Sequence, residues 1–206
     1  MSTAAVSLYG TSLSGHCHRV EALLRLLAVP FRYHETPAED RRSDVFRATL
    51  NPLGEIPVLV DGDLILPDSN AILVYLAQRY DSAGTWYPRE AIPAAQVQRW
   101  LSVAAGEIRR GPCQARLIRR FGLPGDPAPA QEMARRILAV MDGHLADRSF
   151  LALFHPTIAD LACYAYVAWA PEGGIDLDPY PHVRSWLARI AALPGVRAMA
   201  ESERGA

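Results

Sequence analysis

The strand-forming patterns of this sequence stop before its midpoint, and this division limits the possible folds more than any other feature. Up to residue 80, short apolar or alternating runs typical of β-strands alternate with runs of helical spacing. From Ala94 onward only helical patterns occur, separated by segments rich in proline and glycine. The sequence therefore predicts a mixed α/β domain over residues 1–80, a linker over 81–93 and an all-α domain over 94–206.

The first domain is expected to follow the order β-α-β-α-β-β-α, a small mixed sheet with helices on both sides. The turn Asp61-Gly62-Asp63 joins two of its strands into a hairpin. The expected strands cover residues 6–9, 31–34, 58–60 and 64–66, and the expected helices cover 15–28, 41–50 and 69–80. In the second domain, helices are expected over residues 96–121, 131–147, 158–170 and 182–193.

Charge and cysteine content exclude several classes of function. The net charge of -1 gives no general attraction to nucleic acid or anionic membranes. All 21 basic residues are arginine, so a Schiff-base lysine and a phosphate-loop lysine are excluded. The longest apolar run, Leu161–Ala170, is shorter than the roughly 20 residues that span a bilayer. Cys17, Cys113 and Cys163 have no zinc-ligand spacing and make a poor disulfide framework, so we expect a cytoplasmic protein without bound metal.

The stretch SLYGTSLSGHCHRV, residues 7–20, places Ser14 where an expected strand leads into an expected helix. A serine hydroxyl at this position caps free backbone N–H groups of the helix. The same hydroxyl can donate its own proton outward while its oxygen accepts from the backbone. Because a helix N-terminus also favours a bound anion, Ser14 is both a helix cap and a candidate donor to a thiolate.

Two further segments fit the other parts of a peptide ligand. A cis bond before Pro57 would expose the backbone N–H and C=O of Ile56 to an extended peptide; the alternative is an ordinary proline that begins a strand. In LPDSNAI, Asp68 or Ser69 caps the next helix, and this helix end would hold a carboxylate and an amine. A thiol, an extended peptide bond and an amino-acid end together describe glutathione.

Four motifs, in order along nearly the whole chain, resemble those of the cytosolic glutathione S-transferases. They are NPLGEIPVL (51–59), DSNAILVYLAQRY (68–80), PTIADLACYAYV (156–167), in which Thr157 and Asp160 form a helix capping box, and YPHVRSWLARIAALPGV (180–196). The resemblance implies a thioredoxin-like first domain, an all-α second domain and a homodimer. It also implies that glutathione is the co-substrate and that its thiol is activated as a thiolate.

The spacing Ser-x-x-Cys-x-[RV] resembles the serine-using classes of this family, which include theta and phi. This alignment selects Ser14 over Ser12 as the hydroxyl that activates the thiol, with Tyr9 as a rival. His16, in the same turn, either helps to stabilise the thiolate or only flanks it.

The resemblance also assigns the remaining contacts of glutathione. It implies a cis Pro57, with Ile56 holding the cysteinyl backbone, and it assigns the γ-glutamyl end to Asp68 and Ser69. Glu55 stands where many relatives have lysine or glutamine. Its carboxylate would repel the glycine end of glutathione and weaken binding unless an arginine compensates.

The second substrate is expected to be a small hydrophobic electrophile bound between the domains. Its candidate contacts are Trp100, Arg109, Arg110 and Tyr164, although tryptophan and tyrosine more often belong to a core and arginine to a solvated surface. The sequence does not select among conjugation, peroxide reduction, isomerisation and dehalogenation, because all four use the same thiolate.

Two other functions stay open. Ser14-Gly15-His16-Cys17 has the frame of a redox C-x-x-C, so Cys17 could serve glutathione-dependent thiol or peroxide chemistry, which the loss of the first thiol disfavours. The chain could also be a non-catalytic module that binds glutathione or a partner, because fold does not imply activity. The near-zero net charge argues against nucleic acid as the partner of the arginine-rich helix. The arginines of this helix are Arg109, Arg110, Arg116, Arg119 and Arg120.

Overall fold

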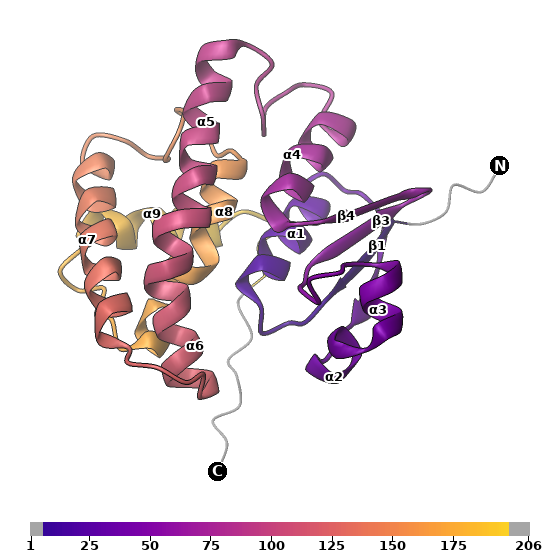
Figure 1. The fold of residues 1–206 in the computed structure, drawn as a ribbon. Coiled ribbons are helices and arrows are strands. Elements are labelled where there is room, and N and C mark those ends of the chain that lie inside the picture. Colours follow the sequence, from indigo (N-terminus) through magenta and orange to yellow (C-terminus); the bar gives the residue numbers. More distant parts are fainter. Residues whose placement is uncertain (1–5, 198–206) are drawn as a thin grey trace. The chain divides into compact units, whose positions relative to one another are not determined.

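The computed structural model describes residues 6–197, and its first part contains a four-stranded mixed sheet (Figure 1). The strand order is β2-β1-β3-β4, with β1 parallel to β2 and the other neighbouring pairs antiparallel. Figure 1 shows α1 and α4 side by side against the sheet, and these two helices contact each other. The elements are β1 (Val6–Gly10), α1 (Gly15–Leu26), β2 (Phe31–Glu35), α2 (Ala38–Arg42), α3 (Asp44–Thr49), β3 (Val58–Asp61), β4 (Leu64–Pro67) and α4 (Ser69–Tyr80).

The single irregular helix expected over residues 41–50 is in fact the two short helices α2 and α3. Ser43 separates them, because its extended backbone ends α2 and its hydroxyl accepts a hydrogen bond from Phe46 N at 3.1 Å. This is ordinary N-capping by serine. The order of elements otherwise confirms the predicted mixed α/β first part.

Strand β1 shows why the sheet has two different faces. Val6, Leu8 and Gly10 are buried, whereas Ser7 and Tyr9 are half-buried, as expected when successive side chains point to opposite faces. Leu8 pairs with Tyr33 of β2 and with Leu59 of β3, so it lies at the centre of the core.

From residue 84 to residue 197 the structure contains helices and no strand, which confirms the predicted all-α second part. None of the helices within residues 6–197 is both long and apolar enough to cross a membrane. The elements are α5 (Ala91–Val103), a π-helix η1 (Ala104–Cys113), α6 (Gln114–Phe121), α7 (Ala128–Leu145), α8 (Ile158–Ala168), a 3-10 turn η2 (Ala170–Gly173) and α9 (Pro181–Ala191).

The π-helix η1 interrupts the continuous helix that the sequence predicted over residues 96–121. Pro112 lies inside it, and a proline removes an N–H donor from the α-helical pattern. At Gly111 the backbone of α7 comes so close that a Cβ would lie 3.0 Å from Ala134 N. The wider turn and the missing side chain together allow this close approach.

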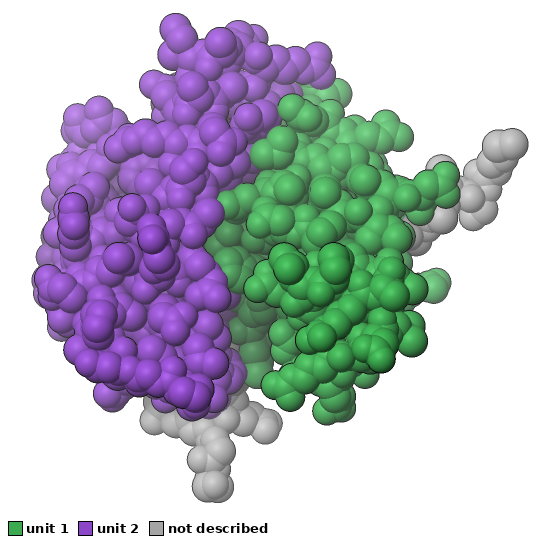
Figure 2. All heavy atoms as spheres, in the orientation of Figure 1, with its two compact units in different colours: residues 1–83, 194–206 green, residues 84–193 purple. Residues whose placement is uncertain are grey.

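Contacts divide the chain into two compact units, coloured separately in Figure 2. The described residues of the first unit are 6–83 and 194–197, and the second unit is residues 84–193. The return of the chain to the first unit is tight, because a Cβ on Gly195 would lie 2.7 Å from Leu26 N. The domain limits predicted from the sequence stay predictions, since contact units describe packing and not independent folding.

Asp160 organises the core of the second unit, and the predicted capping box is confirmed. Its Oδ2 accepts hydrogen bonds from Thr157 N at 2.9 Å and from the Thr157 hydroxyl at 3.3 Å. Its Oδ1 accepts from Leu151 N and from Trp186 Nε1, both at 2.9 Å. Asp160 is fully buried, so this one carboxylate joins α8, α9 and the loop before α8.

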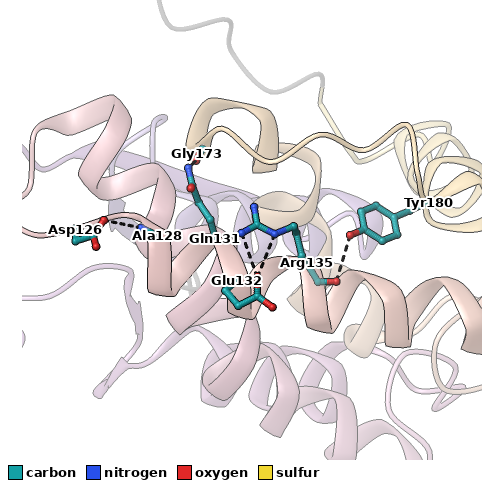
Figure 3. A network of polar contacts seen from close by, with 7 residues as sticks. All are labelled: Asp126, Ala128, Gln131, Glu132, Arg135, Gly173 and Tyr180. Carbon is teal, nitrogen blue, oxygen red and sulfur yellow. Dashed lines mark hydrogen bonds and ion pairs between the residues drawn. The ribbon is translucent and has the colours of Figure 1, made fainter.

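A second polar network fixes the segment that follows α8 against α7 (Figure 3). Gln131 Nε2 donates to the carbonyl of Gly173 at 2.8 Å, and the Tyr180 hydroxyl donates to the carbonyl of Arg135 at 3.3 Å. These two hydrogen bonds hold η2 and the residue before α9 against α7.

Candidate active site

Ser14 lies at the N-terminus of α1, as the sequence predicted, and is its N-cap. Its backbone is extended, and its Oγ accepts a hydrogen bond from Cys17 N at 3.3 Å. This bond does not use the hydroxyl proton, which can point to the neighbouring Cys17 thiol or to an outside group. A half-buried hydroxyl at a helix N-terminus can donate to an anion that the helix dipole also favours.

Cys17 is an unsuitable nucleophile in this fold. Its side chain is 1% exposed, and burial raises the pKa of its thiol to about 11, although the Ser14 hydroxyl opposes this shift. At neutral pH only about one thiol in ten thousand would be ionised at such a pKa. Because the thiolate is the reactive form, the geometry argues against the redox alternative at Cys17.

Tyr9, the rival to Ser14, lies on the other face of the sheet from the start of α1. Gly10 faces Cys17 of α1, and neighbouring side chains in a strand point in opposite directions. The Tyr9 ring stacks on His34 with a centroid distance of 4.5 Å and an interplanar angle of 10°. His34 Nε2 in turn lies 3.2 Å from Ser7 Oγ. The structure therefore favours Ser14 over Tyr9 as the hydroxyl beside the helix end.

The segment before β3 leaves a backbone edge open at Ile56. The Ile56–Pro57 peptide bond is cis, as the resemblance implied, and Pro57 is buried. Within residues 6–197, no group forms a hydrogen bond with the backbone N–H or C=O of Ile56. Unpaired donor and acceptor groups of this kind can pair with an added extended peptide.

Asn51 shapes this segment, and the sequence reasoning missed it. Its side chain is buried, with Nδ2 donating to the carbonyl of Glu55 at 3.0 Å and Oδ1 accepting from Leu53 N at 3.0 Å. The two bonds close the loop that leads to Ile56. The position of Asn51 at the start of the NPLGEIPVL motif was the available signal.

Asp68 caps α4, as the sequence predicted, through hydrogen bonds that Oδ1 accepts from Asn70 N and Ala71 N, both at 2.9 Å. Asp68 has a φ of 75°, a left-handed value that is strained for a residue with a side chain. Such strain is concentrated at functional sites in proteins. Its exposed carboxylate lies at the helix end where the sequence predicted a ligand amine.

Ser69, His16 and the buried Arg19 form a polar network that joins the N-termini of α1 and α4. Ser69 Oγ lies 3.3 Å from His16 Nδ1 and accepts a hydrogen bond from Arg19 Nη1 at 3.3 Å. Arg19 Nη1 also donates to Asn70 Oδ1 at 2.9 Å. The structure thus brings together His16 and Ser69, and it adds Arg19, which is 1% exposed and which sequence reasoning missed.

Glu55 is exposed, and the side chain of one arginine lies close to the residue before it. A Cβ on Gly54 would lie 2.9 Å from the carbonyl oxygen of Arg41 and 3.4 Å from Arg47 Nε. Only Arg47 approaches with its guanidinium, so Arg47 is the nearby candidate to offset the charge of Glu55.

The four residues predicted to contact the electrophile divide into two groups. Trp100 and Tyr164 are 2% and 6% exposed and belong to the core of the second unit, where Tyr164 contacts the ring of Trp186 edge-on. Arg109 and Arg110 lie in the π-helix, Arg110 exposed and Arg109 half-buried. Their roles toward a substrate stay predictions.

Among residues 6–197, no group of three or more histidine, cysteine, aspartate or glutamate side chains is arranged to hold a metal ion. The three cysteines are free and buried.

Comparison with known proteins gives consistent matches over both units. The family model described as "Glutathione S-transferase, N-terminal domain" matches residues 8–84, and the one described as "Glutathione S-transferase, C-terminal domain" matches residues 126–194. The chain is 34% identical to glutathione S-transferase 3 of Zea mays, with 93% of this chain and 91% of the relative covered. It is 30% identical to glutathione S-transferase theta-1 of Bos taurus, with 92% and 84% covered.

A solved structure has a similar sequence identity to this chain. The crystal structure of a glutathione S-transferase from Pseudomonas fluorescens [Pf-5] is 31% identical and has a TM-score of 0.88, with 96% of this chain and 100% of the other covered. The similarity therefore extends over both the sheet-containing unit and the helical unit.

Proposed function

The chain belongs to the glutathione S-transferase family, and we propose that Ser14 activates the thiol of glutathione for attack on a small hydrophobic electrophile. The chain is thus a glutathione transferase, and members of this family use glutathione as a co-substrate. The observation that carries the assignment to Ser14 is its hydrogen bond from Cys17 N, which holds the hydroxyl oxygen at the start of α1 and does not use its proton.

The energy required of Ser14 is modest. A free thiol has a pKa of about 8.5, and lowering it by two units takes about 2.7 kcal/mol of preferential stabilisation of the anion. A hydrogen bond to a charged group contributes about 1.5–3 kcal/mol. The N-terminus of α1 adds to this through its dipole. No buried base or metal is required for the activation.

The peptide part of glutathione would pair with the open backbone of Ile56 beside Pro57. This proposal is supported by the absence, within the described residues, of any hydrogen-bond partner for Ile56 N–H and C=O. Asn51 would keep that edge in place, since it holds the loop on both sides of Gly54.

The γ-glutamyl end would bind at the N-terminus of α4. Its carboxylate would accept hydrogen bonds from the backbone N–H and the hydroxyl of Ser69, because Asn70 N and Ala71 N already donate to Asp68. Its amine would pair with the carboxylate of Asp68. Arg19 lies behind Ser69 and supplies a fixed positive charge, and His16 lies on the other side of the same hydroxyl. At the glycine end, Arg47 would offset the repulsion from Glu55.

For the electrophile, we keep Trp100, Arg109, Arg110 and Tyr164 as the proposed contacts. Arg109 and Arg110 are the better candidates for direct contact, because Trp100 and Tyr164 are almost completely buried. A homodimer and a cytoplasmic location complete the proposal. Sedimentation velocity of the purified chain tests the first of these.

The test of the proposed function is the ionisation of bound glutathione. Thiolate absorbance in the ultraviolet is titrated against pH for the wild type, Ser14→Ala and the control Ser12→Ala, which changes an exposed serine in the same turn. We expect a bound thiol pKa well below the free value in the wild type and in Ser12→Ala, and a return toward the free value in Ser14→Ala. Binding with an unshifted thiol in the wild type would instead support a non-catalytic binding module.

A further inference from the structure

The end of β1 and the first turn of α1 touch at Gly10 and Cys17, without room for a further atom. A Cβ on Gly10 would lie 2.6 Å from Cys17 Sγ, 3.1 Å from Cys17 Cβ and 3.1 Å from the Tyr33 hydroxyl oxygen. Gly10 takes an ordinary strand conformation, so this glycine is required for space and not for backbone freedom. The side chain of Cys17 occupies the volume that a residue at position 10 would otherwise fill.

Cys17 has a second contact, and this one concerns Ser14. Its backbone N–H is the donor that holds Ser14 Oγ. At 3.3 Å this hydrogen bond is already at the long end of the range for N–H to oxygen, so a shift of a few tenths of an ångström would break it. The packing of the Cys17 side chain therefore bears directly on the orientation of the Ser14 hydroxyl.

We propose that Cys17 is a positioning residue for Ser14. Its side chain packs against Gly10 and so fixes the position of its own backbone N–H. This N–H in turn orients the Ser14 hydroxyl toward the thiol of glutathione. This inference rests on the proposed function. It gives the buried cysteine a role that needs no thiol chemistry. It also explains why a small side chain at position 17 and none at position 10 occur together: their combined volume fixes the first turn of α1.

The test changes which of the two residues, 10 or 17, carries the heavy atom that fills the contact between them. Gly10→Ala adds a methyl group against Cys17 Sγ, Cys17→Ala removes Sγ, and the double variant exchanges a sulfur at position 17 for a methyl at position 10. Gly143→Ala is the matched control, because a Cβ at this helical glycine meets no atom within 4 Å. Each variant is assayed for the pKa of bound glutathione, the pH profile of kcat/KM and the melting temperature.

We expect the bound thiol pKa to rise by about one unit in Gly10→Ala, which lowers the thiolate fraction at pH 6.5 about fivefold. Cys17→Ala should show a smaller rise in the bound thiol pKa, which lowers the thiolate fraction about threefold, because the first turn of α1 loses its contact with Gly10. The double variant should return most of the way to the wild-type pKa, and Gly143→Ala should match the wild type.

Unchanged thiol pKa values in both single variants, with only the melting temperature lowered, would overturn the proposal and leave Cys17 as a packing residue. If Gly10→Ala does not fold, Cys17→Ala decides the matter by the same pKa measurement. A wild-type enzyme that binds glutathione without any pKa shift would contradict the proposed function itself, so the two failures are distinguishable.

Discussion

Arg19 Nη1 donates to Asn70 Oδ1 at 2.9 Å and so joins α1 to α4 beneath the two helix N-termini that hold the proposed glutathione contacts. The same nitrogen donates to Ser69 Oγ at 3.3 Å. The guanidinium is almost completely buried, and a charged group is placed there only where specific partners hold it. Arg19 therefore connects the thiol end of the site to the γ-glutamyl end.

Replacing this arginine should weaken glutathione binding more than it slows turnover. We expect Arg19→Met to raise KM for glutathione about tenfold, because hydrogen bonds from a charged donor contribute about 1.5–3 kcal/mol and tenfold corresponds to about 1.4 kcal/mol. Steady-state kinetics with varied glutathione measure this change. The control is Arg25→Met on the same helix, which removes an ion pair with Glu21 at the surface. A KM that stays at the wild-type value in Arg19→Met would show that the network only joins two helices.

The conformation of the loop before Ile56, and with it the binding of glutathione, should depend on Asn51. Asn51→Ala removes the donor to Glu55 C=O and the acceptor for Leu53 N, so the edge that pairs with the peptide becomes loose. We expect the Kd for glutathione to rise about fivefold to tenfold, as for the loss of one or two hydrogen bonds of about 1 kcal/mol each. Isothermal titration with glutathione measures it directly. Thr49→Ala, which removes an exposed hydrogen bond nearby, should bind as the wild type does.

The features that could be predicted from the sequence are those that local chemistry determines. Strands and helices of the first unit follow from their periodicity, and Ser14, Asp68 and Thr157 follow from the preference of helix N-termini for short polar side chains. Each of these depends on neighbours within about four residues. The order of elements and the helix caps at the two ends of the proposed site could therefore be predicted from the sequence.

The features that were missed depend on contacts between distant residues. Arg19 stands in the apolar stripe of a helix, and periodicity does not tell that Ser69 and Asn70, about 50 residues later, provide its partners. The π-helix arises where Gly111 meets the backbone of Ala134, a contact that no local pattern contains. The sequence was also silent on the direction of His16, whose ring nitrogen lies beside Ser69.

The buried carboxylate of Asp160 should be the most sensitive position for stability in the second unit. Asp160→Ala leaves Leu151 N, Thr157 N and Trp186 Nε1 without an acceptor in the core, at about 1–3 kcal/mol for each unsatisfied group. We expect a loss of about 3–5 kcal/mol in the free energy of unfolding, measured by urea denaturation. Asp147→Ala, at an exposed position, should change it by less than about 0.5 kcal/mol. A loss below about 1 kcal/mol for Asp160→Ala would mean that water replaces the carboxylate.

Asp142 should make stability depend on acid pH, because it caps α9 from α7. Burial alone would raise the pKa of this carboxyl, but hydrogen bonds from Val183 N and from His182 outweigh burial and lower the pKa. A carboxylate with a folded-state pKa below its unfolded value stabilises the fold above the unfolded pKa of about 3.9, and this stabilisation is lost as pH falls through the folded value. The free energy of unfolding of the wild type should therefore exceed that of Asp142→Asn by a constant margin from pH 7 to about 5, and the margin should shrink below pH 4. Urea denaturation of both proteins at pH 7, 5, 4 and 3.5 measures it, with His182→Gln to separate any contribution from the imidazole. A margin that grows on acidification would contradict the prediction, because it would mean that burial of the carboxylate dominates its hydrogen bonds.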